Sequence, residues 1–244
     1  DRIVEVHTVG ATIGADLAEF WDTDFSVVFD APTDEQYYEM HGTKTLYWKR
    51  IKAAESRSIK CANKVLVYSD SCLEYLKLEN VPNAQITILP CVINKGLVER
   101  SVDEQFKIGF VGSFLKWHKV EDLVKAFQKF AEVHSDAKLQ LIGAGEEWEN
   151  VKKLVNKLNL FEKIEMPGFV SEVELKKYKA GFSIAIMPGS NWYGSPLKLF
   201  EYGAAGIPFI APNTPTIRSI FKENEHCRFL SDDNTIESIY NDVF

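Results

Sequence analysis

Short apolar runs rich in β-branched residues alternate with segments of helical period along the whole sequence, and this alternation limits the fold more than any other feature. Strands are expected at 3–6, 26–29, 65–68, 86–89, 107–111, 139–142, 164–166, 183–187 and 208–210. Strands that alternate with helices form βαβ units, whose strands pair in parallel. The sequence therefore predicts an α/β protein built on parallel sheets.

The segment that follows Gly112 shows the helical period most clearly. Its apolar residues recur every three or four positions and form one stripe, made of Val120, Leu123, Val124, Phe127, Phe130 and Ala131. Polar side chains, among them Glu121 and Lys125, take the other face. This amphipathic pattern predicts a helix whose stripe packs on the sheet.

The 244 residues exceed one average domain. A polar segment that contains glycine and has no clear period runs from about 94 to 105, and domain boundaries tend to fall in such segments. Two domains are therefore expected, at 1–98 and at 106–244. The formal net charge of -7 argues against nucleic-acid binding, which usually needs a basic surface.

No apolar run approaches the ~20 residues of a membrane-spanning helix, and no two cysteines form a C-x-x-C pair of the kind that binds zinc. Such sparse cysteine use is typical of a reducing compartment, and a cytoplasmic location is expected. The simplest interpretation is a set of buried thiols, namely Cys61, Cys72, Cys91 and Cys227. The segment 43–64 is basic, and two interpretations stay open for it: peripheral contact with the inner face of a membrane, or a solvated helix face.

The stretch 188–208 has the pattern of an anion site. It leads from an apolar strand through Gly189 and Gly194 to an expected helix start, where Ser195 suits the N-cap and Pro196 the first helical position. A helix start has unpaired N–H groups and a partial positive charge, so it attracts phosphate. The carboxyl end of a parallel strand is also where open α/β sheets bind ligands.

Two charged residues follow in the expected helix. Lys198 lies in the first turn, where the helix dipole disfavours a cation, and a bound diphosphate would account for it. Glu201 shares its face one turn later, where a carboxylate is suited to accept hydrogen bonds from ribose hydroxyls. Gly206 suits the end of this helix. The alternative is an ordinary surface helix with a good cap.

Two further loops between strand and helix carry candidate groups. The loop after 107–111 gathers three potential cations, Lys116, His118 and Lys119, near a second helix start. The segment 141–148 begins like the dinucleotide fingerprint G-x-G-x-x-G, but Trp148 replaces its third glycine. We interpret the segment as a tight turn at Gly143 beside the nucleotide, and a nicotinamide cofactor is not expected.

Together these stretches resemble the C-terminal donor domain of family-four retaining glycosyltransferases, which have the GT-B fold. The residues G-S-P-L-K-L-F-E-Y-G-A-A-G-I-P-F-I-A-P at 194–212 are similar to the family pattern G-x-P-x-K-x-x-E-x-x-A-x-G-x-P-x-x-A. V-G-S-x-x-x-W-H-K, L-I-G-A-G-E-E and P-G-F-V-S-E-V-E-L add to the resemblance, which is weaker before residue 105. It implies two Rossmann-like parallel-sheet domains of GT-B type, the N-terminal one incomplete.

The resemblance also implies roles for matching residues. Glu201 would bind the ribose, and Lys198 with the backbone of 195–198 would hold the diphosphate, while Lys116, His118 or Lys119 would add a second cationic contact. The catalytic candidates are Lys198, Glu201 and His7. The donor-binding candidates are Gly112, Ser113, Lys116, His118, Lys119, Gly143, Val170, Tyr193, Gly194, Ser195, Pro196 and Leu197.

Three positions depart from the family pattern. Tyr193 stands where many members carry Glu, Ser113 where they usually carry Arg, and Pro32 where many carry a His close to the reacting sugar. Each candidate for replacing that His is equally suited to a turn or a cap; they are Asp30, Asp34 and His7.

The resemblance implies retaining transfer of a hexosyl group from a nucleotide diphosphate sugar to a saccharide or lipid-linked acceptor, as in polysaccharide biosynthesis. The family needs no metal, and no cofactor is expected. Helix-start N–H groups and lysines would stabilise the leaving diphosphate. Two alternatives stay open: a nucleotide-sugar-binding or regulatory partner without turnover, and a nucleotide-sugar epimerase on the same fold.

Overall fold

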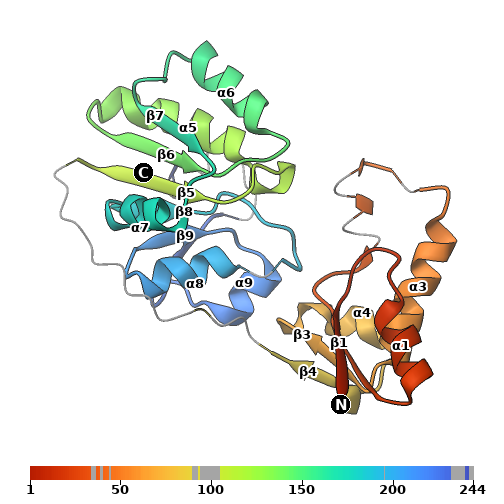
Figure 1. The fold of residues 1–244 in the computed structure, drawn as a ribbon. Helices are drawn as coiled ribbons and strands as arrows, with labels where there is room; N and C mark the ends of the chain where they lie inside the picture. The colour runs from red at the N-terminus through yellow and green to blue at the C-terminus, as the bar shows by residue number, and fades with distance from the viewer. Residues whose placement is uncertain are drawn as a thin grey trace. The chain divides into compact units, whose positions relative to one another are not determined.

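The computed structural model describes residues 1–33, 37–38, 41–43, 45–89, 93, 105–194, 196–231 and 240–241. The chain divides into two compact units, each with its own sheet (Figure 1). The first unit comprises Asp1–Cys91 and Trp192–Ser195, and the second comprises Val92–Asn191 and Pro196–Phe244. The expected linker falls on 94–104, which lie outside the described residues.

The first unit has a parallel sheet with the strand order β1-β2-β3-β4. Its described elements are β1 (Arg2–Val6), α1 (Ile13–Trp21), β2 (Asp24–Val28), α3 (Trp48–Cys61), β3 (Lys64–Val67), a 3₁₀ turn (Asp70–Cys72), α4 (Leu73–Leu78), a second 3₁₀ turn (Asn83–Gln85) and β4 (Ile86–Ile88). Phe25, Val27, Val65 and Val67 are buried in the core that the strands share with α1 and α3. Burial of these alternating apolar residues fixes the register of the sheet.

The second unit has a six-stranded parallel sheet with the order β10-β9-β8-β5-β6-β7. Its described elements are β5 (Lys107–Val111), a 3₁₀ turn (Lys116–His118), α5 (Val120–Val133), β6 (Lys138–Ile142), α6 (Trp148–Lys157), β7 (Ile164–Gly168), α7 (Glu172–Ala180), β8 (Ile184–Ile186), α8 (Leu197–Ala204), β9 (Phe209–Ala211), α9 (Pro215–Ile220) and β10 (Arg228–Phe229). The chain moves outward from β5 through β6 to β7, and β8 then lies on the other side of β5. This reversal makes the space between β5 and β8 the topological switch point, where open α/β sheets bind ligands.

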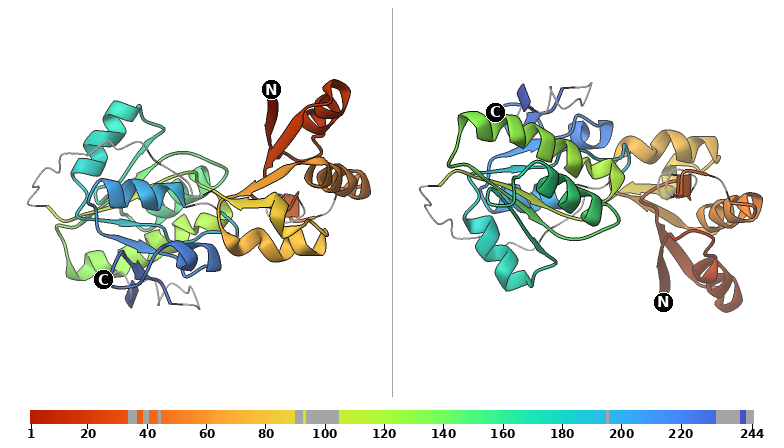
Figure 2. Two further views of the ribbon diagram at one scale, coloured as in Figure 1. Left: turned by 90° about the horizontal axis from the view of Figure 1, so that it is seen from below. Right: turned by 90° about the horizontal axis from the view of Figure 1, so that it is seen from above.

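Helices cover both faces of this sheet (Figure 2). On one face, α5 and α6 bury residues such as Phe127 and Val151 against β5 and β6. On the other face, α8 and α9 bury Leu199, Tyr202 and Ile217. Two hydrophobic layers therefore hold the strands, and the loops at their carboxyl ends stay at the surface.

The strands expected from the sequence are all present, with bounds that agree within two residues. The stripe from Val120 to Ala131 is buried on α5, as its period predicts. Gly206 has a φ of 65° just after α8, in agreement with its expected place at the helix end. The start of α8 corrects the sequence analysis: Pro196 occupies the N-cap position, with a φ of -85° and a ψ of 54°, so the helix begins at Leu197. Ser195 lies outside the described residues.

The basic segment and the cysteines can now be placed. Within α3, the Lys52 Nζ lies 2.6 Å from Glu55, and the Arg57 guanidinium lies 2.7 Å from both Asp16 and Glu19, so these cations face carboxylates of the same unit. Cys72 and Cys227 are buried, but Cys61 is exposed, which corrects the expectation for that thiol; Cys91 lies outside the described residues. None of the helices formed by the described residues has the length and apolar character needed to cross a bilayer.

Candidate functional site

The loops after β5 and β8 meet at the switch point. A Cβ placed on Gly189 would lie 2.3 Å from the carbonyl oxygen of Trp117, so the two backbones pack together without room for a side chain. The Lys119 stem also lies against Gly189, 3.0 Å from the same Cβ position. Backbone from two loops that are distant in the sequence therefore packs together at the switch point.

Lys198 lies in the first turn of α8, and its amine reaches the loop after β5. Its Nζ is 3.1 Å from Nε2 of His118 and 5.2 Å from the centre of the Phe110 ring. A Cβ on Gly112 would lie 2.5 Å from this Nζ, so the glycine leaves the space that the amine occupies. Burial lowers the pKa of Lys198 to about 8, and the nearby Glu201 carboxylate opposes part of this shift.

His118 is the buried partner of that amine. Its Nδ1 donates to the carbonyl oxygen of Ser113 over 2.6 Å, and its side chain is enclosed by Phe110 and Trp117. Burial, and then the charge of Lys198, lowers the pKa of His118 to about 4. At neutral pH the imidazole is therefore uncharged.

Glu201 lies one turn further along α8 and has a partner that the sequence analysis missed. Nζ of Lys179, on α7, lies 3.0 Å from Oε2 of Glu201. The Lys179 side chain is only 10% exposed, whereas the Glu201 side chain is 42% exposed. Lys179 thus holds one carboxylate oxygen of Glu201, while the Glu201 side chain remains accessible to solvent. The sequence offered no signal for this pair, because the two residues lie on different helices.

Tyr202 holds α8 in place against the sheet. The backbone N–H of Val111, at the end of β5, donates to the Tyr202 hydroxyl over 3.0 Å, and the ring is fully buried. This bond ties α8 to the strand that carries the Gly112 loop. The face of α8 that bears Lys198 and Glu201 is therefore set by an interaction in the core.

A cavity of about 390 Å³ opens at the carboxyl ends of β5, β6 and β7. Its lining comprises Val111, Gly112, Ser113, Ile142, Gly143, Ala144, Phe169, Val170 and Leu175. The structure thus brings together four donor-binding candidates: Gly112, Ser113, Gly143 and Val170. Gly143 has a φ of 132°, and a Cβ there would lie 1.9 Å from the Gly112 carbonyl oxygen. The close approach of the two loops therefore requires glycine at this position.

The remaining candidates lie in different surroundings. Lys116 is exposed, and Lys119 is the N-cap of α5, with a φ of 50°. Pro196 is buried, Leu197 is 49% exposed and Gly194 is half-buried. Tyr193 packs in the core of the first unit, and the centre of its ring lies 5.3 Å from that of Trp192.

His7 is buried in the first unit, with its side chain wholly inaccessible. Its Nε2 lies 2.9 Å from Oγ1 of Thr33 and 3.6 Å from Oε2 of Glu55. Glu55 also accepts from the Thr33 backbone, from Lys52 and from the Tyr75 hydroxyl. Although burial would raise it, hydrogen bonds with His7, Lys52 and Thr33 lower the pKa of Glu55 to about 2. His7 and Glu55 thus belong to a buried network of hydrogen bonds and ion pairs. Because the His7 side chain is inaccessible, these contacts give no support to the catalytic role expected for it.

Of the other candidates for replacing the family histidine, Asp30 is half-buried and Asp34 lies outside the described residues. Pro32, which stands at the position of that histidine, is buried.

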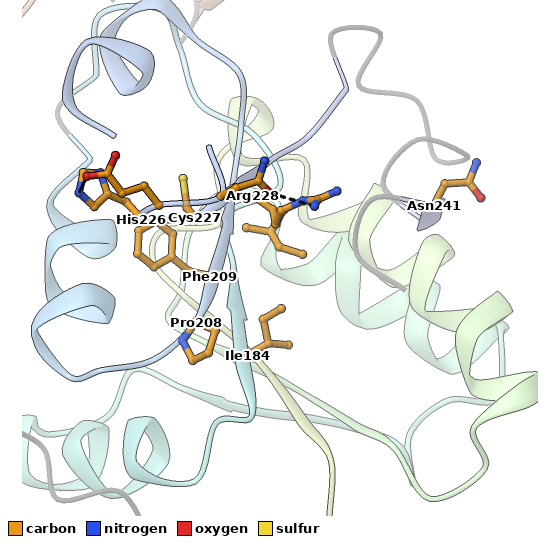
Figure 3. Close-up of a pocket in the computed structure, with 10 residues that line it drawn as sticks. Ile184, Pro208, Phe209, His226, Cys227, Arg228 and Asn241 are labelled. Atoms are coloured by element: carbon orange, nitrogen blue, oxygen red, sulfur yellow. Dashed lines mark hydrogen bonds and ion pairs between the residues drawn. The ribbon is translucent and has the colours of Figure 1, made fainter. Parts of the chain in front are cut away.

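A second cavity, of about 590 Å³, lies at the amino ends of β8, β9 and β10 (Figure 3). Ile184, Phe209 and Arg228 line it, and these residues begin β8, β9 and β10. Nη1 of Arg228 donates to Asn224 over 3.0 Å within its wall. Because parallel sheets bind ligands at the carboxyl ends of their strands, the smaller cavity beside Gly112 is the stronger candidate.

Known proteins resemble this chain in sequence and in fold. Residues 98–243 match the family Glycosyl transferases group 1. An uncharacterized glycosyltransferase of Haemophilus influenzae is 30% identical over 130 residues, which cover 53% of this chain and 36% of that protein. The 2-deoxystreptamine N-acetyl-D-glucosaminyltransferase of Niallia circulans is 21% identical over 208 residues, which cover 80% of this chain and 52% of that protein.

Solved structures share the fold. The Anabaena protein HepE, in complex with UDP and glucose, superposes with a TM-score of 0.79 over 98% of this chain and 66% of that one, at 10% identity. Sucrose-phosphate synthase from Thermosynechococcus elongatus superposes with a TM-score of 0.81 over 99% of this chain and 63% of that one, at 17% identity. The chain thus spans less than two thirds of each of these relatives. The α/β fold with parallel sheets, of GT-B type, is confirmed. Because the family model matches residues 98–243, more than half of the chain, the chain belongs to the family Glycosyl transferases group 1.

Proposed function

We propose that this chain binds a nucleotide diphosphate sugar and forms part of a retaining, metal-independent glycosyltransferase, which passes a hexosyl group to a saccharide or lipid-linked acceptor. The observation that carries the proposal is the position of the Lys198 amine at the switch point, 3.1 Å from His118 and directly over Gly112. Burial removes this amine from water and the positive end of the helix dipole repels it, and a bound diphosphate would offset both costs.

The surroundings supply the rest of a donor site. The cavity beside Gly112 is lined mainly by apolar groups and backbone, which suits the flat face of a nucleoside base. Glu201, one turn beyond Lys198, would accept hydrogen bonds from the ribose. When the bond from the sugar to the phosphate oxygen breaks, negative charge grows on that oxygen, and the Lys198 ammonium with the first N–H groups of α8 would stabilise it.

The relatives favour this kind of chemistry. HepE was solved with UDP and glucose, and the Niallia circulans protein is named as an N-acetyl-D-glucosaminyltransferase. We extend from them only the class of donor, a uridine or other nucleoside diphosphate sugar. The place in polysaccharide biosynthesis is proposed from the family resemblance. The free thiols of Cys72 and Cys227 suit a cytoplasmic location. Membrane contact through 43–64 is left out of the proposal, because Lys52 and Arg57 already face carboxylates.

Two substitutions in the full-length protein test the site. Lys198→Ala removes a charge-assisted contact worth about 1.5–3 kcal/mol, so UDP affinity measured by calorimetry is expected to fall about ten- to hundredfold. Glu201→Ala is expected to weaken binding as well and to slow hydrolysis of the donor. Lys153→Ala and Glu149→Ala, both exposed on α6, are the matched controls. Wild-type affinity and turnover in both site variants would refute the proposal.

Product analysis separates the proposal from its alternatives. A glycoside whose anomeric configuration matches the donor, identified by nuclear magnetic resonance, supports retaining transfer. A free epimerised nucleotide sugar indicates an epimerase. Tight UDP binding with no product from any acceptor indicates a binding partner without turnover.

A further inference from the structure

We propose that His118 is a positioning residue: as a neutral hydrogen-bond acceptor it aims the Lys198 ammonium at the diphosphate, and it brings no positive charge of its own to the site. The inference rests on the proposed function, since it assigns a diphosphate to Lys198. It also changes the interpretation of the loop after β5, where the sequence suggested that His118 is one of three cations.

The hydrogen bond on the inner side of the ring fixes where the proton lies. Nδ1 of His118 is 2.6 Å from the carbonyl oxygen of Ser113. A carbonyl oxygen only accepts hydrogen bonds, so Nδ1 must carry the hydrogen. A neutral imidazole has a single N–H, and Nε2 is therefore left with a lone pair.

The outer side of the ring faces a group that only donates. Nζ of Lys198 lies 3.1 Å from Nε2, and an ammonium has three N–H donors and no acceptor. One of its donors therefore points at His118, and the other two stay available for an anion. Protonation of Nε2 would replace this bond with two cations at the same short distance.

The ring itself is held firmly. The His118 backbone N–H donates to the carbonyl oxygen of Leu115 over 2.9 Å, and the ring centre lies 6.0 Å from that of Phe110. The residue is 8% exposed. Phe110, Gly112 and His118 thus lie around the amine and restrict its position before a ligand arrives. The charge that acts on it is that of Glu201, on its own helix.

Substitution distinguishes aiming from a general structural role. His118→Leu keeps a buried side chain without an acceptor, and the affinity of the full-length protein for UDP is expected to fall about tenfold, the loss of one oriented charge-assisted contact. His118→Gln can present an amide oxygen to the ammonium, and its affinity is expected to stay within about threefold of wild type. His134→Leu and His134→Gln, at the exposed end of α5, are the matched controls. Equal losses in both His118 variants, or none in either, would overturn the aiming role.

The proton position can be measured without any nucleotide. The ¹⁵N resonances of His118, assigned by their disappearance in His118→Gln, are expected to report a neutral ring with its hydrogen on Nδ1 at neutral pH. A charged ring, or a hydrogen on Nε2, would overturn the inference even in a protein that binds UDP. Conversely, a correct tautomer in a protein that binds no UDP would refute the proposed function and the aim at a diphosphate, while leaving the hydrogen bond itself intact.

Discussion

The charge that Lys198 contributes to the candidate site depends on pH. The pKa of Lys198 lies at about 8, whereas an exposed lysine keeps its charge to about pH 10. Raising the pH therefore removes the Lys198 charge before that of ordinary lysines. His118, with its pKa at about 4, is neutral throughout this range.

The first prediction concerns this titration. If a diphosphate binds the charged amine as proposed, the Kd for UDP is expected to rise about tenfold between about pH 7 and about pH 9, where the charged fraction of a group with a pKa near 8 falls by that factor. The terminal phosphate of UDP, with a pKa of about 6, is ionised across this interval. Calorimetry on the full-length protein measures the effect. Lys198→Arg stays charged, so its affinity should be flat; the same slope in that variant would contradict the assignment.

The loops after β5 and β6 approach each other closely at Gly112 and Gly143. At Gly143 the backbone takes a φ of 132°, and the Cβ of an alanine would lie 1.9 Å from the Gly112 carbonyl oxygen. Gly143→Ala must therefore push the loops after β5 and β6 apart, at an expected cost of about 2 kcal/mol or more. The midpoint of thermal unfolding should fall by several degrees. Gly203→Ala, on the exposed side of α8, places its Cβ 3.8 Å from Phe209 and should raise the midpoint slightly. Equal midpoints for the two variants would contradict this account.

Sequence patterns anticipated these elements unevenly. The stripe on α5 was readable because seven buried residues follow one helical period over fourteen positions. β10 was missed because two residues, Arg228 and Phe229, are too few to show any period. The start of α8 was placed one residue early because Pro196 suits a first turn, yet its φ and ψ are not helical here.

For the molecule as a whole, the positive charge of the proposed site comes from Lys198 and the start of α8. The protein therefore has its own means of stabilising a leaving diphosphate. Turnover of the full-length enzyme is expected to change by less than about twofold when a chelator such as EDTA is added, because no step is assigned to a metal ion. Loss of activity that Mg²⁺ restores would contradict metal independence.

The candidate site was only partly accessible from the sequence. Lys198 and Glu201 could be identified because they are three residues apart on one helix, in a local pattern. The parts played by His118 and Lys179 could not, because each depends on a contact across the fold: His118 meets Lys198 80 residues away, and Lys179 meets Glu201 22 residues away. The sequence suggested that His118 is a potential cation, whereas its burial keeps the imidazole neutral, so its Nε2 can accept a hydrogen bond.

The hydroxyl of Tyr202, which receives the last amide of β5, has a kinetic consequence. It fixes α8, which bears Lys198 and Glu201, to the central strand β5, so these two residues are in place in the second unit before a ligand binds. A ligand is therefore expected to bind without a slow rearrangement of α8. The speed of capture is then governed by diffusion and by the fraction of collisions with the correct orientation.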